Sequence, residues 1–417
     1  MFIMLLYIDP GTGSMLFSIL VGVVSTLVFF GQRLFMKLKF VLSGGKAKKI
    51  SDAKIPYVIF CDHKRYWNVF KPVCDEFEKR GVDLVYWTAS PDDPALKEQY
   101  EHVKTKFIGE GNKAYAHLNM MNTGICLSTT PGLDVYQWKR SRNCDWYVHI
   151  PHTVDELLGY RMFGLDFYDA VLLTGEFQRA DLQALEKMRK IKEKEFVTVG
   201  STYLDTMRRR IASCNSAGKK SFITVLLAPS WGKSSILSKY GFNIIEALVK
   251  TGFNVIIRPH PQTVSAEKIV IEPLLKKYPD SELLHWNYDN DNFSVLAKSD
   301  IMITDFSGII LDYAFVFGKP LIYADTNYDI APYDAAWFDE TNWRLRILPE
   351  LGTRLDEKDF PRMKDIIESA LHNETFRQNR ERLSDEAWQN KGGAAVATVD
   401  YLIDKYAKLK EEQSKRN

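Results

Sequence analysis

Two histidines follow short apolar runs and stand beside prolines. His260 lies in NVIIRPHP, two residues after Arg258, and His152 follows the run WYVHIP. A neutral imidazole can take a proton from an attacking hydroxyl near pH 7, and the arginine fork matches a phosphate. Together the two motifs predict proton transfer beside a bound phosphate. Each motif alone also fits a strand end with solvated or structural side chains.

A third group of candidate residues directly follows the apolar run DIMIT. It consists of Asp305, Ser307 and Gly308, and the run IILDYAFVF follows it as an expected helix. Free N–H groups at a helix N-terminus attract anions, so Ser307 and Gly308 fit a phosphate, although Ser307 also fits an ordinary helix cap. Asp312 falls inside the apolar helix, where an unpaired charge is costly. It fits a ligand contact, a pairing with a base, or a purely structural role.

Secondary structure must bring these motifs together at one site. Apolar, strand-like runs alternate with charged, helix-like stretches, which predicts parallel sheets covered by helices. The pattern begins at PYVIFCD, ends at FVTVG and restarts with TVLLAPS after residues 213–221. We therefore expect two doubly wound, Rossmann-like domains, residues 55–212 and 213–417. Ligands bind outside the carboxyl ends of such strands, so both histidines are expected in one cleft between the domains.

Composition narrows the class of protein. A chain of 417 residues exceeds what one core supports, and 46% hydrophobic and 26% charged residues are typical of a folded enzyme. A net charge of +2 argues against a nucleic-acid binder. Five scattered cysteines without a CxxC pair argue against zinc and a disulfide framework. We expect no essential metal, because the nearest acidic candidates, Asp155-Glu156 and Asp289-Asn290-Asp291, fit helix starts and turns better.

Residues 1–54 differ from the rest of the chain. The segment MLFSILVGVVSTLVFF (residues 15–30) has no charge, and Arg33 and several lysines follow it. A spanning helix needs about 20 apolar residues, and the basic flank places the later residues in the cytoplasm. A signal peptide would carry its positive charge before the apolar run. We expect a single-pass anchor and basic linker at the inner or plasma membrane. The alternative is a helix that lies in the membrane interface.

The motifs carry a family resemblance. RPHP, SDIMITDFSGIILDYAFVFGKPLIYAD, LLAPSW and the segment around His152 resemble the CDP-glycerol glycerophosphotransferase family, which contains the teichoic-acid primases and polymerases. The resemblance runs from about residue 56 to the end of the chain and implies a GT-B-like fold. It also implies that His152 is the general base, that His260 meets the donor pyrophosphate, and that Ser307 binds donor phosphate.

Three positions depart from the family pattern. Gly308 stands where the family's Asp-(Tyr/Phe)-Ser-Ser element has its second serine. Lys233, in Trp-Gly-Lys, stands near the place of an arginine and could supply the charge. Thr153 follows His152, where His-Gly-x-Pro is common in the polymerases. These differences bear on the acceptor and the polyol more than on the family.

The expected function is that of a membrane-tethered transferase of the EC 2.7.8 type. It would move a polyol phosphate, with glycerol phosphate expected, from a CDP-polyol to a hydroxyl of a cell-envelope glycan or lipid-linked acceptor, and release CMP. The expected partners are CDP-glycerol or a related donor substrate, the acceptor and membrane lipids, with no cofactor and no nucleic acid. The expected catalytic residues are His152 and His260, and the expected substrate-binding residues are Arg258, Ser307, Gly308, Asp305, Asp312 and Lys233. Two alternatives remain: a GT-B glycosyltransferase that uses a nucleotide sugar, and a catalytically silent binding relative.

Overall fold

The computed structural model describes residues 54–214, 222–289, 291–326, 328–340 and 342–416. The apolar segment at residues 15–30, expected to be a membrane anchor, lies outside these ranges. Among the helices that are described, none has the length and apolar character needed to cross a membrane.

The first lobe is built on a seven-stranded sheet in the order β3-β2-β1-β4-β5-β6-β7, and every registered strand pair is parallel. Central strands such as β4 and β6 are buried along almost their whole length, and the sequence of β6, AVLL, is apolar throughout, as expected for a strand covered on both faces. The strands are β1 (Ile55–Cys61), β2 (Leu84–Thr88), β3 (Val103–Phe107), β4 (Asn122–Ser128), β5 (Asn143–His149), β6 (Ala170–Leu173) and β7 (Glu195–Thr198).

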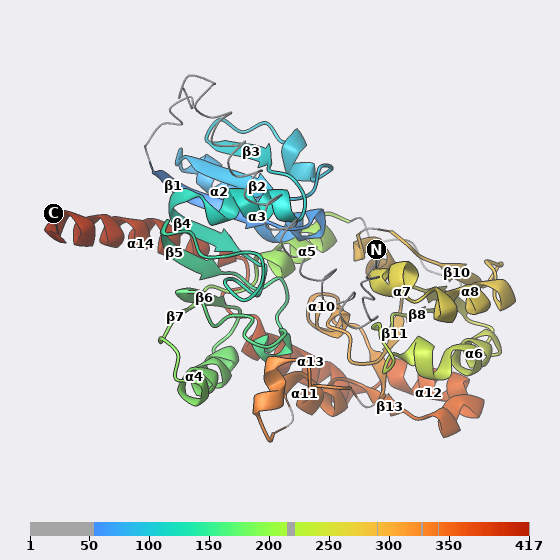
Figure 1. Ribbon diagram of the computed structural model, residues 1–417. Coiled ribbons are helices and arrows are strands. Elements are labelled where there is room, and N and C mark those ends of the chain that lie inside the picture. The colour runs from blue at the N-terminus through green and yellow to red at the C-terminus, as the bar shows by residue number, and fades with distance from the viewer. Residues whose placement is uncertain (1–53, 215–221, 290, 327, 341, 417) are drawn as a thin grey trace, which may run out of the picture. The chain divides into compact units, whose positions relative to one another are not determined.

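The second lobe repeats this plan with a six-stranded sheet in the order β10-β9-β8-β11-β12-β13, again parallel throughout its registered pairs. Its strands are β8 (Thr224–Leu227), β9 (Asn254–Ile257), β10 (Leu284–Trp286), β11 (Ile301–Thr304), β12 (Leu321–Ala324) and β13 (Thr353–Leu355). The expected α/β class with two doubly wound sheets is confirmed, and Figure 1 shows the two sheets with their helices.

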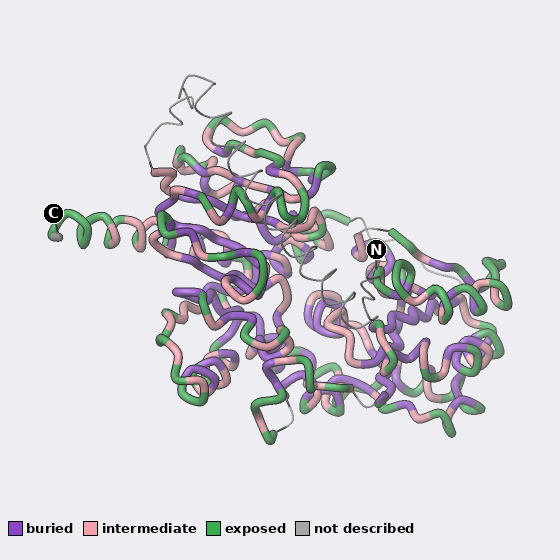
Figure 2. Tube along the Cα trace, in the orientation of Figure 1, coloured by how far each residue is buried: buried purple, intermediate pink, exposed green. Residues whose placement is uncertain are grey.

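Helices cover the faces of both sheets, and the tube in Figure 2 shows buried strands inside a partly exposed helical layer. The first lobe contains α2 (Trp67–Lys79), α3 (Asn112–Asn119), α4 (Phe177–Arg189) and α5 (Thr202–Ser213). The later helices are α6 (Ile236–Val249), α7 (Pro261–Ala266), α8 (Lys268–Lys277), α9 (Phe293–Lys298), α10 (Ile309–Val316), α11 (Trp343–Leu351), α12 (Met363–Leu371), α13 (Glu374–Ala387) and α14 (Ala394–Arg416).

The last helix, α14, returns to the first lobe. Val399 and Leu402 are buried in the same apolar cluster as Ile59 and Phe77 of that lobe. The hydroxyl of Tyr401 in α14 also accepts a hydrogen bond of 3.2 Å from the indole N–H of Trp146 in β5. The chain therefore crosses between the lobes a second time, and the C-terminal helix belongs to the packing of the first sheet rather than the second.

In both sheets the strand order reverses beside the first strand of the lobe, between β1 and β4 and between β8 and β11. Such switch points open a crevice at the carboxyl ends of the strands, where ligands of doubly wound sheets bind. A shared core joins the lobes there: Val154 and Leu204 of the first lobe pack with Ile310 and Leu311 of α10. The loops that carry the candidate residues thus rest on rigid elements of both lobes.

Candidate functional site

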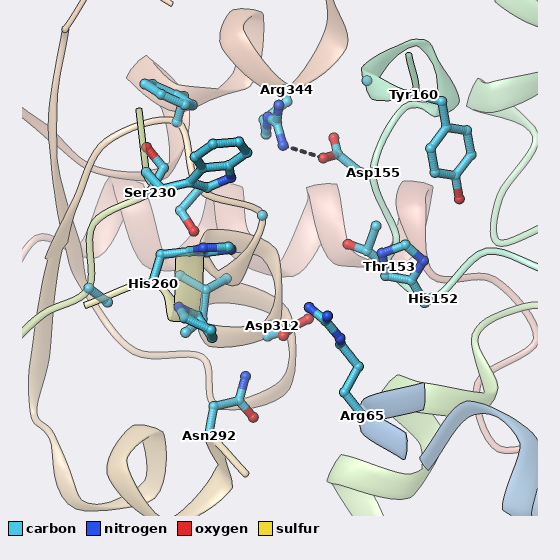
Figure 3. Close-up of a pocket in the computed structure, with 18 of the residues that line it drawn as sticks. Arg65, His152, Thr153, Asp155, Tyr160, Ser230, His260, Asn292, Asp312 and Arg344 are labelled. Atoms are coloured by element: carbon cyan, nitrogen blue, oxygen red, sulfur yellow. Dashed lines mark hydrogen bonds and ion pairs between the residues drawn. The ribbon is translucent and has the colours of Figure 1, made fainter. Parts of the chain in front are cut away.

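A cavity of about 1140 Å³ lies between the carboxyl ends of the two sheets and is lined by residues of both lobes (Figure 3). Seven of the eight residues expected from the sequence line it. These are His152 from the first lobe and Lys233, Arg258, His260, Ser307, Gly308 and Asp312 from the second. The tertiary structure therefore brings together residues that lie up to 160 positions apart in the chain.

His152 lies three residues past β5. Its Nδ1 is 3.1 Å from the hydroxyl oxygen of the buried Thr129, and its ring is 4.7 Å from the ring of Tyr66. Burial and the nearby guanidinium of Arg65 lower the pKa of His152 to about 4. The imidazole is consequently neutral at pH 7, and when Nδ1–H donates to Thr129, Nε2 is left as the basic nitrogen.

His149 is the structural histidine of this strand. It is fully buried, and its Nε2 lies 2.9 Å from the hydroxyl of Tyr160. Burial holds its pKa well below the usual value, so it adds no charge to the site. Strand alternation, which directs His149 into the core, leaves the next histidine past the strand end to face the cavity.

His260 is the N-cap of α7, and its Nδ1 accepts a hydrogen bond of 3.2 Å from the backbone N–H of Gln262. Burial, Arg65 and Arg258 lower the pKa of His260 to about 4, so the ring is neutral. Because a backbone N–H can only donate, the proton of the neutral ring must lie on Nε2. His260 is thus held as a hydrogen-bond donor, and Trp231 stacks on its ring at 6.2 Å.

Two cations of the second lobe lie near His260. The guanidinium of Arg258 is held by the side-chain oxygen of Asn287 and, at 2.8 Å, by the carbonyl of Asp289. Both of these hydrogen-bond partners are uncharged, and the carboxylates of Asp289 and Asp291 act on Arg258 only through space, so the guanidinium can still bind an anion. Lys233 is exposed in the loop after β8, and the preceding Gly232 is fixed at φ +93° by a hydrogen bond of 3.0 Å to Glu267.

Ser307 and Gly308 precede α10, and both line the cavity. Gly308 occupies the N-cap position and no side chain caps the helix, so the hydroxyl of Ser307 is not used as the helix cap. A Cβ at Gly308 would lie 3.9 Å from the nearest side-chain atoms, among them the hydroxyl oxygen of Thr153. A side chain at position 308 would therefore be in ordinary van der Waals contact with the cavity wall, and the helix start contributes N–H donors suited to a phosphate to the cavity lining.

Asp305 does not line the cavity, which corrects its expected role as a ligand contact. It is fully buried, and its carboxylate accepts hydrogen bonds of 2.9 Å from the backbone N–H groups of Ser230 and Ile236. Burial raises its pKa, and these hydrogen bonds oppose that rise. Asp305 ties the loop after β8 to the end of β11 and so positions the groups that do face the cavity.

Asp312 lines the cavity from the first turn of α10. Its Oδ2 accepts a hydrogen bond of 3.2 Å from the hydroxyl of Tyr203, whereas Oδ1 has no partner among the described residues. Burial raises the pKa of Asp312 to about 7. The carboxyl is therefore poised between its neutral and ionised forms and can either donate to or accept from a ligand.

Arg65 is a site residue that the sequence analysis missed. Figure 3 shows its side chain reaching into the space between His152 and His260, and its charge lowers the pKa of both. Arg65 is exposed to the cavity and forms no ion pair among the described residues. The sequence signal was present: DHKRYW follows β1 as RPHP follows β9, and β1 lies at the switch point.

Arg344 is a second missed residue, and it joins the lobes. It is buried in the cavity wall, pairs with Asp155, and donates its backbone N–H to Glu156 at 3.0 Å. Asp155 and Glu156, weighed from the sequence as weak metal candidates, are instead partners of this arginine. Among the described residues, no group of three or more His, Cys, Asp or Glu side chains could hold a metal ion.

The family model described as CDP-glycerol:poly(glycerophosphate) glycerophosphotransferase matches residues 138–339, which include every second-lobe candidate and His152. A search of curated protein sequences gave no match.

Solved structures resemble the whole fold. The wall teichoic acid polymerase TagF aligns with a TM-score of 0.54 at 15% identity, covering 92% of this chain and 99% of that one. The UDP-GlcNAc 2-epimerase of Methanocaldococcus jannaschii aligns at 0.55 and 13% identity over 84% and 99% of the two chains. S. aureus MnaA with UDP aligns at 0.58 and 12% identity over 85% and 97%.

At these identities the structural matches establish the fold, which is GT-B-like. The family model covers the part of the chain that supplies most of the cavity and confirms the resemblance carried by RPHP and DFSG. The chain is therefore a CDP-glycerol glycerophosphotransferase-like enzyme.

Proposed function

We propose that the protein transfers a polyol phosphate, glycerol phosphate foremost, from a CDP-polyol to a hydroxyl of a cell-envelope glycan or lipid-linked acceptor, and releases CMP. One observation carries the proposal. An imidazole of the first lobe that is neutral at pH 7, His152, faces the same cavity as an array of phosphate-type donors of the second lobe, Arg258, His260 and Ser307.

The proposed step is an in-line displacement at the β-phosphorus. The acceptor hydroxyl gives its proton to Nε2 of His152 as its oxygen bonds to the β-phosphorus. The bond from that phosphorus to the bridging oxygen breaks, its electron pair stays on the bridging oxygen, and CMP departs. Thr129 keeps the imidazole in the required tautomer and holds the imidazolium that forms.

The second lobe supplies charge stabilisation and position. His260 donates from Nε2, Arg258 offers its guanidinium, and the start of α10 offers backbone N–H groups to the pyrophosphate. Arg65 adds a cation from the opposite lobe. In phosphoryl transfer most of the catalysis comes from such positioning and charge stabilisation. The proposal assigns the pyrophosphate charge to these side chains, so we expect activity without a divalent metal.

We further propose that residues 15–30 tether the enzyme to the inner or plasma membrane with its catalytic lobes in the cytoplasm. Support comes from the uncharged run and the basic residues after it. A tether confines the enzyme to the surface where a lipid-linked acceptor lies. Flotation of the full chain with anionic liposomes, compared with a chain lacking residues 1–53, tests this part alone.

The decisive experiment measures nucleotide release from CDP-glycerol, CDP-ribitol and a UDP-sugar, with a membrane lipid extract as acceptor source and with and without EDTA. CMP release from one CDP-polyol that His152→Ala and His260→Ala each reduce about 100-fold or more supports the proposal. Turnover of the UDP-sugar alone assigns a glycosyltransferase instead. CDP-polyol binding without turnover in any acceptor mixture contradicts the enzyme reading, and loss of activity in EDTA contradicts the metal-free step.

A further inference from the structure

A second cavity, of about 480 Å³, lies at the carboxyl ends of the strands on the other side of β1. Its lining comes from the ends of β1 and β2 with the loops that follow them, from the loop between β3 and α3, and from α3 itself, all within the first lobe. The volume falls within the range of small-ligand sites. None of the residues expected from the sequence lies in it, and the chemistry described above does not use it.

One turn of chain separates this cavity from the main one. The wall is the 3₁₀ turn η1 (Lys64–Tyr66), and Lys64 lines both cavities. A turn of this type rises about 2 Å per residue, so the wall is about 6 Å long. Tyr66, at its far end, lies against the ring of His152. A molecule with one hydroxyl at His152 can therefore extend over this wall into the second cavity.

The polar groups of the cavity match hydroxyls. The Oδ1 atom of Asp62 is buried and has no hydrogen-bond partner among the described residues. Nδ1 of His63 accepts the backbone N–H of Arg65 at 3.2 Å, so in the neutral ring Nε2 carries the proton and donates. Tyr115, which adds a hydroxyl, completes a set with one acceptor, one donor and one group that does both.

The charge of the cavity excludes phosphates. Asp62, Asp92 and Glu110 line it, and its lysine, Lys64, is already paired with Asp92. Burial and the neighbouring Arg65 lower the pKa of His63, which therefore brings no positive charge at neutral pH. Burial raises the pKa of Asp62, but Asp92 and Glu110 are exposed carboxylates that repel a phosphate at close range. The main cavity has the opposite character, with Arg65, Arg258 and Lys233 in its lining.

We propose that the second cavity binds a neutral, hydroxyl-rich sugar at the end of the acceptor, which rests on the proposed transferase function. The acceptor hydroxyl lies at His152 and the adjoining sugar ring lies between Asp62, His63 and Tyr115. A chain of polyol phosphates is a poor occupant, because its phosphates would meet the unpaired carboxylates. The preferred acceptor is therefore an unphosphorylated glycan end rather than a growing polyol-phosphate polymer.

The test measures binding separately from turnover. Saturation-transfer NMR on the full chain uses methyl glycosides of neutral hexoses and N-acetylhexosamines as probes, and an oligo(glycerol phosphate) as the anionic comparator. Glu110→Trp fills the exposed rim of the cavity, and Glu193→Trp, at an exposed position outside both linings, is the matched control. Tyr115→Phe removes one polar contact without changing shape, and Asp62→Asn replaces the charged carboxylate with a neutral group of the same shape that still has an acceptor oxygen.

We expect at least one neutral glycoside to bind, and about tenfold weaker binding in Glu110→Trp and Tyr115→Phe, the second as for the loss of one good hydrogen bond. CDP-glycerol affinity stays unchanged in all four variants. Equal glycoside binding in Glu110→Trp, no glycoside binding at all, or tighter binding of the oligo(glycerol phosphate) overturns the inference. Failure of CDP-glycerol to bind the wild-type chain contradicts the proposed function instead, so the two failures are distinguishable.

Discussion

The ring nitrogen Nδ1 of His260 accepts a hydrogen bond from the backbone N–H of Gln262, two residues further along the chain. This contact makes His260 a donor at Nε2, whereas Nδ1 of His152 meets the hydroxyl of Thr129 and leaves Nε2 as the basic nitrogen when Nδ1–H donates. Two histidines with the same lowered pKa, about 4, therefore have opposite roles in the proposed step.

Glutamine should separate these roles. A glutamine amide places an N–H near the position of Nε2 but cannot take a proton. We expect His260→Gln to keep much more activity than His260→Ala, which should lose about 10²- to 10³-fold in kcat. His152→Gln should be as inactive as His152→Ala. Steady-state CMP release measures all four, and rescue at position 152 would show that His152 is not the base.

The pH dependence should reflect a base with a low pKa. His152 must be neutral to accept a proton, and its pKa of about 4 keeps it neutral throughout the range above pH 5. We expect kcat/KM to stay level from about pH 5.5 to 7 and to fall only as the pH approaches 4. Initial rates in a constant-ionic-strength buffer series check this, and a descending limb centred near 6.5 would contradict the proposed environment.

Arg65 should control the pH at which kcat/KM falls on the acid side of the profile. Its charge lowers the pKa of both histidines, so Arg65→Gln should raise both values and move the acid limb of the pH profile towards neutral pH. Loss of a cation beside the pyrophosphate should also reduce kcat, by about 10- to 100-fold. Arg65→Lys keeps the charge and should recover the position of the limb. An unchanged limb in Arg65→Gln assigns the residue a purely structural role.

Asp312 should make the fold less stable at alkaline pH. Its pKa is 3.8 in the unfolded chain and about 7 in the folded one, so its contribution is fully present below pH 3.8 and is lost as the pH rises through 7. Between pH 5 and 8 this amounts to about 3 kcal/mol. Asn at position 312 cannot titrate, so the Asp312→Asn variant should not lose this part of the free energy of unfolding between pH 5 and 8. Thermal unfolding at both pH values measures it, and parallel losses in the two proteins exclude the effect.

Arg344 should hold the lobes together. Arg344→Met leaves Asp155 and Glu156 buried without their cation, which should reduce the free energy of unfolding by about 3–5 kcal/mol. Arg346 lies on the same helix, is exposed and is a matched control, since Arg346→Met should cost less than about 0.5 kcal/mol. Chemical denaturation compares the two variants. Equal small effects would mean that the buried pair adds little to stability.

The sequence by itself determined the class of fold and most of the donor side of the site. Alternating strand and helix patterns specify parallel sheets, because the hydrophobic periodicity of each element depends only on neighbouring residues. Ligands of such sheets bind at the carboxyl ends of the strands. For that reason Arg258, His260, Ser307 and His152 could be found without coordinates. The same rule applies to Arg65, because DHKRYW follows β1 as RPHP follows β9.

Only the tertiary structure decided what the charged residues do. Asp305 and Asp312 lie seven residues apart and both follow a strand, yet Asp305 is enclosed by backbone N–H groups and Asp312 faces the cavity. Asp155 meets Arg344 across 189 positions of sequence, so no local pattern could pair them. Burial, tautomer and ion pairing depend on which surfaces meet when the lobes close on one another, and that information is not local in the chain.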